Sequence, residues 1–431
     1  MKLIFFILLL LINSNISFSA NDLIIYLDSA YKNNPKLNAE RKNLKATKEN
    51  INISRSEFLP SISLSGSIDN NRTSNATSQK GTTLEGSKLE TEKKTISIDQ
   101  KIFQGFEGYN SLKKSELEVE QANFKIKKVE QEVLLDAAKA YFDLMYKSKK
   151  LKFNFANVSL FERQVESDSS RLQKGEITLT DLAQSESSLA GANAELISAE
   201  TDLLTTKADF KRVTRVNAPK EVDENSKFNI DLPVDLNKAL EISSKKNPKL
   251  LIAKLEYEIS KKNLNIEKAK LSPKASINYS KSEVSELSSN VDNTDEQSVK
   301  ATITWPLIKG GKNFSSIKKS RFKQQQNSLI LEDVENEVKT LTTNAWSVYQ
   351  SAESVLKATK AQVQAAEIAN EGITSEYDSG NTRTTLEVIQ SRSLLLNARI
   401  ANAKAERDFV VSKLKLLSTV GSLSVGSIKK Q

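Results

Sequence analysis

The chain has 431 residues, with 63 Lys and Arg against 54 Asp and Glu, and it contains neither Cys nor His. Without Cys or His it lacks the ligands of ordinary zinc sites, a thiol nucleophile and a Ser-His-Asp triad, so we expect no enzyme, metal site or cofactor. The net charge of +9 arises from interspersed charges rather than from a basic arm of the kind that binds nucleic acid.

The N-terminus has the pattern of a secretory signal peptide. Lys2 precedes the apolar run Leu3–Ile12, which is too short to span a bilayer as a helix. Small residues near Ala20 offer a cleavage site, so we predict a signal peptide at 1–19; a buried N-terminal helix is the alternative. No later segment has about 18 uncharged apolar residues in a row, so only a β-barrel could hold the mature chain in a membrane.

After the signal peptide, one plan occurs twice along the chain. NNPKL at Asn33–Leu37 recurs as KNPKL at Lys246–Leu250, 213 positions later. QGFEGYNSLKKS at Gln104–Ser115 aligns with KGGKNFSSIKKS at Lys309–Ser320, now 205 positions later, so the first copy is longer by eight residues between these motifs. Such repetition indicates two units built alike. The predicted segments are a first repeat at 20–216, a linker at 217–232, a second repeat at 233–421 and a C-terminal tail at 422–431.

Each repeat contains one very long segment with helical spacing. Tyr109–Lys174 has no Gly or Pro, and its apolar residues recur every seven positions with one step of four, which is typical of a coiled coil with a stutter. Val334–Val355 keeps the alternation of four and three in the second repeat. A helix of about 66 residues would reach roughly 100 Å, and Gly175 and Gly380 are predicted to turn each long helix back on itself. Shorter helices are predicted at Leu37–Phe58, Thr180–Thr214, Leu250–Leu271 and Thr385–Thr419.

Between the helices the apolar residues change to a spacing of two. Ile62, Leu64 and Ile68 alternate with serines, and similar alternation marks three further segments, giving strand pairs at about 61–103 and 274–305. Strands of about ten residues suit a tilted membrane crossing, although each pair could also be an amphipathic hairpin packed on helices. Four strands cannot close around a lumen, because about eight are needed even for a filled barrel, so a membrane barrel requires several chains. The predicted loops between paired strands are about Asn71–Lys93 and Glu283–Glu296.

In this order the elements resemble the TolC family of outer-membrane efflux and secretion channels over essentially the whole mature chain. The shared features are Asn-Pro starts at Asn34 and Asn247, glycine-rich corners at Gly105 and Gly310, and helix turns containing KGEITLTD and YDSGNTR. The resemblance implies a chain that is mainly α with a membrane β part, built as two tandem repeats of long antiparallel coiled-coil helices and strand pairs. It further implies a homotrimer with a twelve-stranded β-barrel in a Gram-negative outer membrane, continued by a twelve-helix periplasmic α-barrel.

The same resemblance implies a passive exit duct for a type I secretion or multidrug efflux system, which docks with a periplasmic adaptor (membrane fusion) protein and an inner-membrane transporter. The first turn favours type I secretion, whereas the cargo and the partners cannot be read from the sequence. A secreted coiled-coil structural or adhesin-like protein is the alternative, because the heptads alone would suffice for it. The alternating strands argue against that protein, and the signal peptide argues against a basic coiled coil that binds nucleic acid.

The resemblance also places functional residues at the two helix turns. In the family, an acidic residue six positions after the first-turn glycine meets a tyrosine and an arginine that flank the second-turn glycine, and together they hold the tunnel closed. The matching gating latch here is Asp181, Tyr377 and Arg383, beside the helix-tip turns at Gly175 and Gly380. The alternative is that Asp181 only stabilises the first turn of its helix and that Tyr377 only packs.

A tunnel constriction is implied next to the second turn. Glu387 matches an acidic position that faces the narrow tunnel mouth, whereas the family's next acidic position is Gln390 here. The second turn holds one extra residue, so the register at Arg383 and Glu387 stays open by one position. Arg215 also departs from the pattern, because many members have Gly where the first repeat ends. A glutamate on a solvated helix face is the alternative for Glu387.

Overall fold

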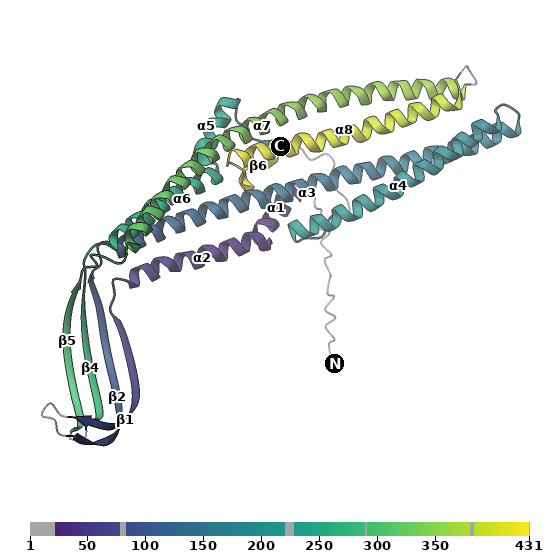
Figure 1. The fold of residues 1–431 in the computed structure, drawn as a ribbon. Coiled ribbons are helices and arrows are strands. Elements are labelled where there is room, and N and C mark those ends of the chain that lie inside the picture. The colour runs from purple at the N-terminus through teal and green to yellow at the C-terminus, as the bar shows by residue number, and fades with distance from the viewer. Residues whose placement is uncertain (1–21, 78–82, 220–227, 289–290, 380–382, 431) are drawn as a thin grey trace, which may run out of the picture. The chain divides into compact units, whose positions relative to one another are not determined.

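The computed structural model describes residues 22–77, 83–219, 228–288, 291–379 and 383–430. The predicted signal peptide at 1–19 and the turn residue Gly380 lie outside these residues. Within them, long helices, a four-stranded antiparallel sheet and a two-stranded sheet confirm the predicted class, which is mainly α with a smaller β part (Figure 1). None of the described helices is long and apolar enough to cross a lipid bilayer.

Two helices of 67 residues, α3 (Glu107–Gln173) and α7 (Lys312–Asp378), occupy equivalent places in the two repeats. Neither contains a proline, whose ring would interrupt the backbone hydrogen bonds of a helix. The helices α1 and α5, which precede the Asn-Pro motifs, are additional to those expected from the sequence. The shorter helices are α1 (Asp22–Asn33), α2 (Pro35–Ser56), α4 (Leu179–Thr214), α5 (Leu236–Lys246), α6 (Pro248–Ala269) and α8 (Thr385–Thr419).

The Asn-Pro motifs join the start of each repeat to the end of its last helix. Both α2 and α6 begin at a proline, because the first residue of a helix needs no backbone N–H. The Asn34 side-chain amide donates to the Val213 carbonyl at 3.2 Å, and that of Asn247 donates to the Thr419 carbonyl at 2.7 Å. The repeated motif therefore makes the same tertiary hydrogen bond in both repeats.

The last helix of each repeat is followed by a residue in the left-handed conformation. Gly421 has a φ of 81°, and Arg215 has a φ of 63°. The Arg215 N–H donates to the Lys211 carbonyl at 3.0 Å and closes the end of α4. A side chain in this conformation costs roughly 1–2 kcal/mol, which is why glycine is usual there. Arg215 therefore adopts a left-handed backbone conformation like that of Gly421 at the end of the second repeat.

The chain forms two compact units, and each combines parts of both repeats. A helical unit contains the described residues up to 39, 128–247 and from 338 onward, and a sheet unit contains 40–127 and 248–337. In the helical unit, Tyr26 packs edge-on against Phe210 with ring centroids 4.9 Å apart. Within the predicted linker and C-terminal tail, for which no strands were expected, β3 (Phe228–Ile230) pairs with β6 (Ile428–Lys430). The boundaries of the two repeats stay a prediction, because the compact units cut across them.

The sheet unit holds a four-stranded antiparallel sheet in the order β1-β2-β4-β5. Its register places Ile62 opposite Ile98 on one face, while Ser63 and Ser97 share a hydrogen bond of 2.8 Å on the other. The apolar face is uncovered in the single chain, since Ile62 is 72% exposed and Ile303 is 79% exposed. The outer strands β1 and β5 have open edges. The strands are β1 (Ser61–Thr77), β2 (Thr83–Phe103), β4 (Lys274–Ser288) and β5 (Val291–Thr304).

The predicted loops between paired strands are wrong in extent. Most of Asn71–Lys93 and Glu283–Glu296 continues the two hairpins as paired strand. The error has a physical cause: alternation marks only strand segments with one apolar face, whereas the backbone ladder continues through Thr- and Ser-rich sequence that has no such face. Beyond the pair Glu92 and Ser285, β2 no longer pairs with β4, so the first hairpin extends past the second.

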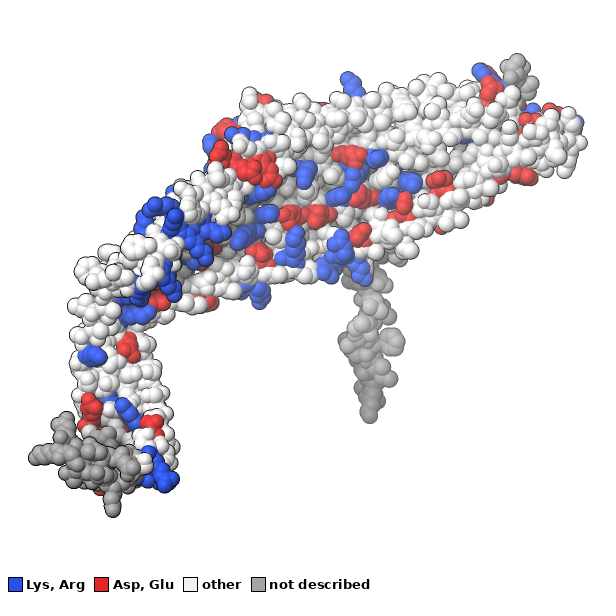
Figure 2. Space-filling view, in the orientation of Figure 1, with Lys and Arg blue, Asp and Glu red and all other residues white. Residues whose placement is uncertain are grey.

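Surface charge is not distributed evenly over the visible face. Figure 2 shows bases gathered where Figure 1 places α6, with few acids between them. Along the part of α3 seen in the same view, bases and acids alternate.

Candidate functional site at the helix turns

Both helix turns end in the same capping motif. Thr178 precedes α4, and its N–H and hydroxyl donate to the Asp181 carboxylate at 2.9 and 2.7 Å. Thr384 precedes α8, and its N–H and hydroxyl donate to Glu387 at 2.8 and 3.1 Å. In return, each threonine oxygen accepts the N–H of the acidic residue, which completes a capping box. In the first turn, Gly175 takes a φ of 76°, a conformation that glycine favours.

The capping boxes make Glu387 the counterpart of Asp181. A constant offset of 205 would instead align Asp181 with Leu386, so the structure agrees with one extra residue in the second turn. Hydrogen bonds from Thr178 lower the pKa of Asp181, and those from the Thr384 backbone, followed by Arg383, lower the pKa of Glu387. The signal available in the sequence was a threonine three positions before each acid, in TLTD and TTLE.

Arg383 links the end of α7 to the start of α8. Its guanidinium donates to Glu376 at 2.6 Å and to Glu387 at 3.0 Å. These two carboxylates raise the pKa of Arg383, so it stays charged. Within one protomer Arg383 therefore pairs with acids of its own turn rather than with Asp181.

Tyr377 is buried among polar side chains from four helices. Only 5% of Tyr377 is exposed, and its hydroxyl donates to the Asp168 carboxylate at 2.8 Å and lies 3.1 Å from the Thr385 hydroxyl. Ser185 and Gln164 also donate to Asp168, at 2.5 and 2.9 Å. Burial is the main cause that raises the pKa of Tyr377, so the hydroxyl keeps its proton as a donor. The cluster joins α3, α4, α7 and α8 close to their turns.

Asp168 is the residue that sequence reasoning missed. It is fully buried, at 0% exposure, on the helix that precedes the first turn. A buried carboxylate needs several donors, and the three described here supply them. Asp168 lies three positions after Val165, which belongs to the predicted coiled-coil seam, so a charged residue on an apolar stripe was the available signal.

The structure separates the three residues of the predicted latch within the protomer. Asp181 bonds to Thr178, Tyr377 bonds to Asp168, and Arg383 bonds to its own turn. The guanidinium of Arg171, in the last turn of α3, lies 4.6 Å from the centre of the Tyr377 ring. The gating latch stays a prediction, as does the tunnel constriction at Glu387 and the exposed Gln390.

The polar contacts of this site join the ends of neighbouring helices. Among the described residues, no three acidic side chains converge in a way that could hold a metal ion. The groups that meet at the turns are hydroxyls, carboxylates and guanidinium groups, whose hydrogen bonds fix the geometry of adjoining helices. Such bonds at a helix end can be broken and reformed without covalent chemistry.

Comparison with known proteins gives consistent likenesses. The family model described as "Outer membrane efflux protein" matches residues 26–214 and 239–422. The outer membrane efflux protein BepC of Brucella suis is 27% identical over 406 residues, covering 94% of this chain and 86% of that protein. The outer membrane protein TolC of Vibrio cholerae is 24% identical over 416 residues, covering 94% and 92%. In fold, the crystal structure of the Campylobacter jejuni CmeC outer membrane channel matches with a TM-score of 0.82 at 14% identity, over 93% of this chain and 85% of that one.

Proposed function

Because this chain belongs to the outer membrane efflux protein family, whose members are channel proteins of the outer membrane and not enzymes, we propose that three copies form one exit duct. The secreted adhesin-like alternative has no support from these relatives. The duct is passive and serves a multidrug efflux or a type I secretion system. The turn sequence favours secretion, whereas the relative with 27% identity is named an efflux protein, so both remain within the proposal.

The observation that carries the trimer is the open sheet. In one chain, β1 and β5 are edge strands, and exposed edges of this length are usually paired or covered in stable proteins. Pairing β5 of each copy with β1 of the next would close three sheets of four strands into one twelve-stranded barrel. In the trimer, the backbone N–H and C=O groups at the edges of β1 and β5, which have no strand partner in a single chain, would be hydrogen-bonded.

The two faces of the sheet suit the two environments of such a barrel. The register groups Ile62, Ile98, Ile277 and Ile303 on one face, which we assign to the lipid. On the other face, Asn278 donates to Asp99 at 2.7 Å and serines line the strands, as suits a water-filled lumen. The long helices then continue the duct as the twelve-helix α-barrel in the periplasm.

The helix turns form the end of the duct at which we expect other proteins to bind. We assign to this end the docking of a periplasmic adaptor and an inner-membrane transporter, which supplies the energy. The latch of Asp181, Tyr377 and Arg383 and the ring of Glu387 carboxylates belong to the same end. Export to this location requires cleavage of the predicted signal peptide at 1–19.

The test exploits the absence of native Cys. Ser63 lies in β1 and Ser298 in β5 of the same sheet, three strand spacings apart, which is about 14 Å. A disulfide needs Cα atoms closer than about 7 Å, so Cys at these positions can link only neighbouring copies. We expect Ser63→Cys paired with a Cys scan along β5 to give covalent trimers on oxidation, and the purified trimer to conduct ions in planar bilayers. A water-soluble monomer without conductance or cross-links would refute the duct.

A further inference from the structure

The junction between the sheet and the helices of the sheet unit carries exposed aromatic side chains. Phe58 precedes β1, Phe106 and Tyr109 follow β2, and Trp305 follows β5. The Trp305 indole donates to the Leu271 carbonyl at 3.1 Å, yet 63% of the residue is exposed. Aromatic girdles of this kind mark the boundary between membrane and water in outer-membrane proteins. In the proposed duct, this junction lies at the membrane surface that faces the periplasm.

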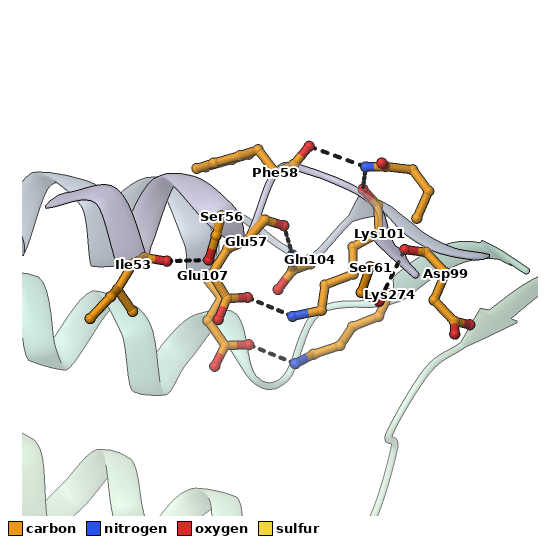
Figure 3. Close-up of polar contacts among 11 residues, drawn as sticks. Ile53, Ser56, Glu57, Phe58, Ser61, Asp99, Lys101, Gln104, Glu107 and Lys274 are labelled. Carbon is orange, nitrogen blue, oxygen red and sulfur yellow. Dashed lines mark hydrogen bonds and ion pairs between the residues drawn. The ribbon is translucent and has the colours of Figure 1, made fainter. Parts of the chain in front are cut away.

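Several bases at the junction are already paired with acids. Lys101 binds Glu57 and Lys274 binds Glu107, both at 2.6 Å, and the two pairs lie side by side in Figure 3. On α3, Lys113 binds Glu116 at 2.9 Å. These ammonium groups are neutralised locally, so they offer little charge to a further ligand.

The first part of α7 is different, because it carries bases and no acid. Between Lys312 and Leu331 no Asp or Glu occurs, and the first acidic residue is Glu332. None of these bases makes an ion pair with a carboxylate of the described chain, and all are exposed. The bases are Lys312, Lys318, Lys319, Arg321 and Lys323.

A polar groove of about 370 Å³ runs between α6 and α7 beside two of these bases. Its donors include the ammonium groups of Lys319 and Lys323, the hydroxyls of Ser316 and Ser320, and the Asn263 amide. On α7, Lys319 and Ser320 follow Ser316 by three and four positions, and Lys323 follows them by four and three, so these residues share one flank of the helix. We call this site the α6/α7 groove.

Both carboxylates in the α6/α7 groove are already engaged. Glu256 accepts the Gln121 side-chain amide at 2.6 Å, and Glu267 pairs with Lys270 at 2.7 Å. Neither carboxylate forms an ion pair with Lys319 or Lys323, although Glu256, whose partner is a neutral amide, keeps its negative charge in the groove. Lys323 donates to the Gln326 side-chain carbonyl at 3.0 Å, but neither Lys319 nor Lys323 forms an ion pair with a carboxylate of the described chain. The combination of these ammonium groups with hydroxyl and amide donors suits a phosphate, which accepts several charge-assisted hydrogen bonds at once.

We propose that the α6/α7 groove binds the phosphate of an anionic lipid headgroup in the membrane leaflet that faces the periplasm, a proposal that rests on the duct described above. Ser316 and Lys323 lie about 6 and 17 Å along α7 from its start, counted at about 1.5 Å per residue. Side chains on a helix lean toward its N-terminus, which for α7 is the sheet end, so the lysine stems point back toward the membrane. The source of the phosphate is the membrane, because the aromatic junction holds the groove next to it.

The experiment measures lipid binding to the intact trimer by native mass spectrometry. The trimer is titrated with phosphatidylglycerol and, separately, with zwitterionic phosphatidylethanolamine. The double variant Lys319→Gln with Lys323→Gln is expected to bind phosphatidylglycerol about 10–25-fold more weakly, since each lysine near an anionic surface contributes about fivefold. The matched control, Lys113→Gln with Lys114→Gln, removes bases that already pair with Glu116 and Glu118 at 2.9 and 3.5 Å, and its binding should stay within about twofold.

Four outcomes overturn the lipid site while leaving the duct intact. The proposal fails if the groove variant binds phosphatidylglycerol as the native protein does, or if the control loses as much affinity. It also fails if inorganic phosphate or glycerol phosphate displaces the lipid at equal concentration, because the groove then recognises a free phosphate. Trimer mass and pore conductance are measured on the same preparations. A native protein that is not a trimer or does not conduct refutes the duct. A conducting trimer that does not distinguish phosphatidylglycerol from phosphatidylethanolamine refutes only the lipid site.

Discussion

The hydrogen bond between Tyr377 and Asp168 gives a quantitative prediction. Tyr377→Phe removes one hydroxyl and leaves the buried Asp168 with two donors, Ser185 and Gln164, in place of three. A hydrogen bond to a charged group contributes about 1.5–3 kcal/mol, and the ring itself is retained. We therefore expect the variant to lose about 1.5–3 kcal/mol of unfolding free energy per chain.

The assay is urea denaturation of the detergent-solubilised protein, followed by far-ultraviolet circular dichroism. Tyr109→Phe is the matched control, since Tyr109 is exposed and should change stability by no more than about 0.5 kcal/mol. In an Asp168→Asn background the partner is neutral, so the effect of Tyr377→Phe should shrink to about 0.5–1.5 kcal/mol. An equal effect in both backgrounds, or one below about 0.5 kcal/mol in the native background, would refute the reasoning.

Conductance of Tyr377→Phe distinguishes two roles for the Tyr377 hydroxyl, one in closing the pore and one only in helix packing. If Tyr377 takes part in closing the turns, pores formed by Tyr377→Phe should conduct more than native pores at matched trimer yield. Lower stability with unchanged conductance would instead assign the hydroxyl to packing of the four helices.

Three further predictions concern the sheet and the turns. Ile98→Arg should impair trimer assembly while Ser63→Arg is tolerated, because only the first places a charge in lipid; equal yields of folded trimer would contradict this assignment of faces. Arg383→Ser should free the carboxylate of Glu387 and raise conductance and cation preference, whereas Glu387→Ala should lower cation preference. Reversal potentials in a salt gradient measure the cation preference of both variants. If neither variant shifts the reversal potential, Glu387 is only a solvated residue. The folded-state pKa of Asp181 is lowered, so its stabilising effect is present above the usual pKa and is lost as pH falls through about 4 and below. The native protein should therefore lose more thermal stability than Asp181→Asn between pH 6 and pH 3 at roughly constant ionic strength. Equal losses in the two proteins would speak against the cap.

Local patterns in the sequence were sufficient for the type and order of most elements. The spacing of apolar residues in Tyr109–Lys174 depends only on the geometry of one helix, so it predicts α3 without knowledge of its neighbours. The same holds for the alternation around Ile62, which marks the start of β1. Repetition of the Asn-Pro motif was enough to indicate two equivalent halves, since similar sequences form similar local structure and contacts.

Features that depend on distant partners could not be predicted in this way. The hairpins continue through residues without alternation, because a backbone ladder is set by the neighbouring strand and not by the side chains alone. The pairing of β3 with β6 joins segments about 200 residues apart, and neither segment carries a signal of its own. At the turns, the resemblance pointed to Asp181 as the partner of Tyr377, whereas within the protomer Tyr377 binds Asp168.

The sequence by itself determined the helical and strand periods, the two repeats and the positions of the turns, because each of these is encoded in residues close together in the chain. Only the tertiary structure decided which polar groups meet. Asp168 meets Tyr377, Arg383 meets acids of its own turn, and Lys319 and Lys323 lie beside the α6/α7 groove. The physical reason is that a buried or charged side chain takes its partner from whichever elements pack beside it, and that choice depends on the fold as a whole.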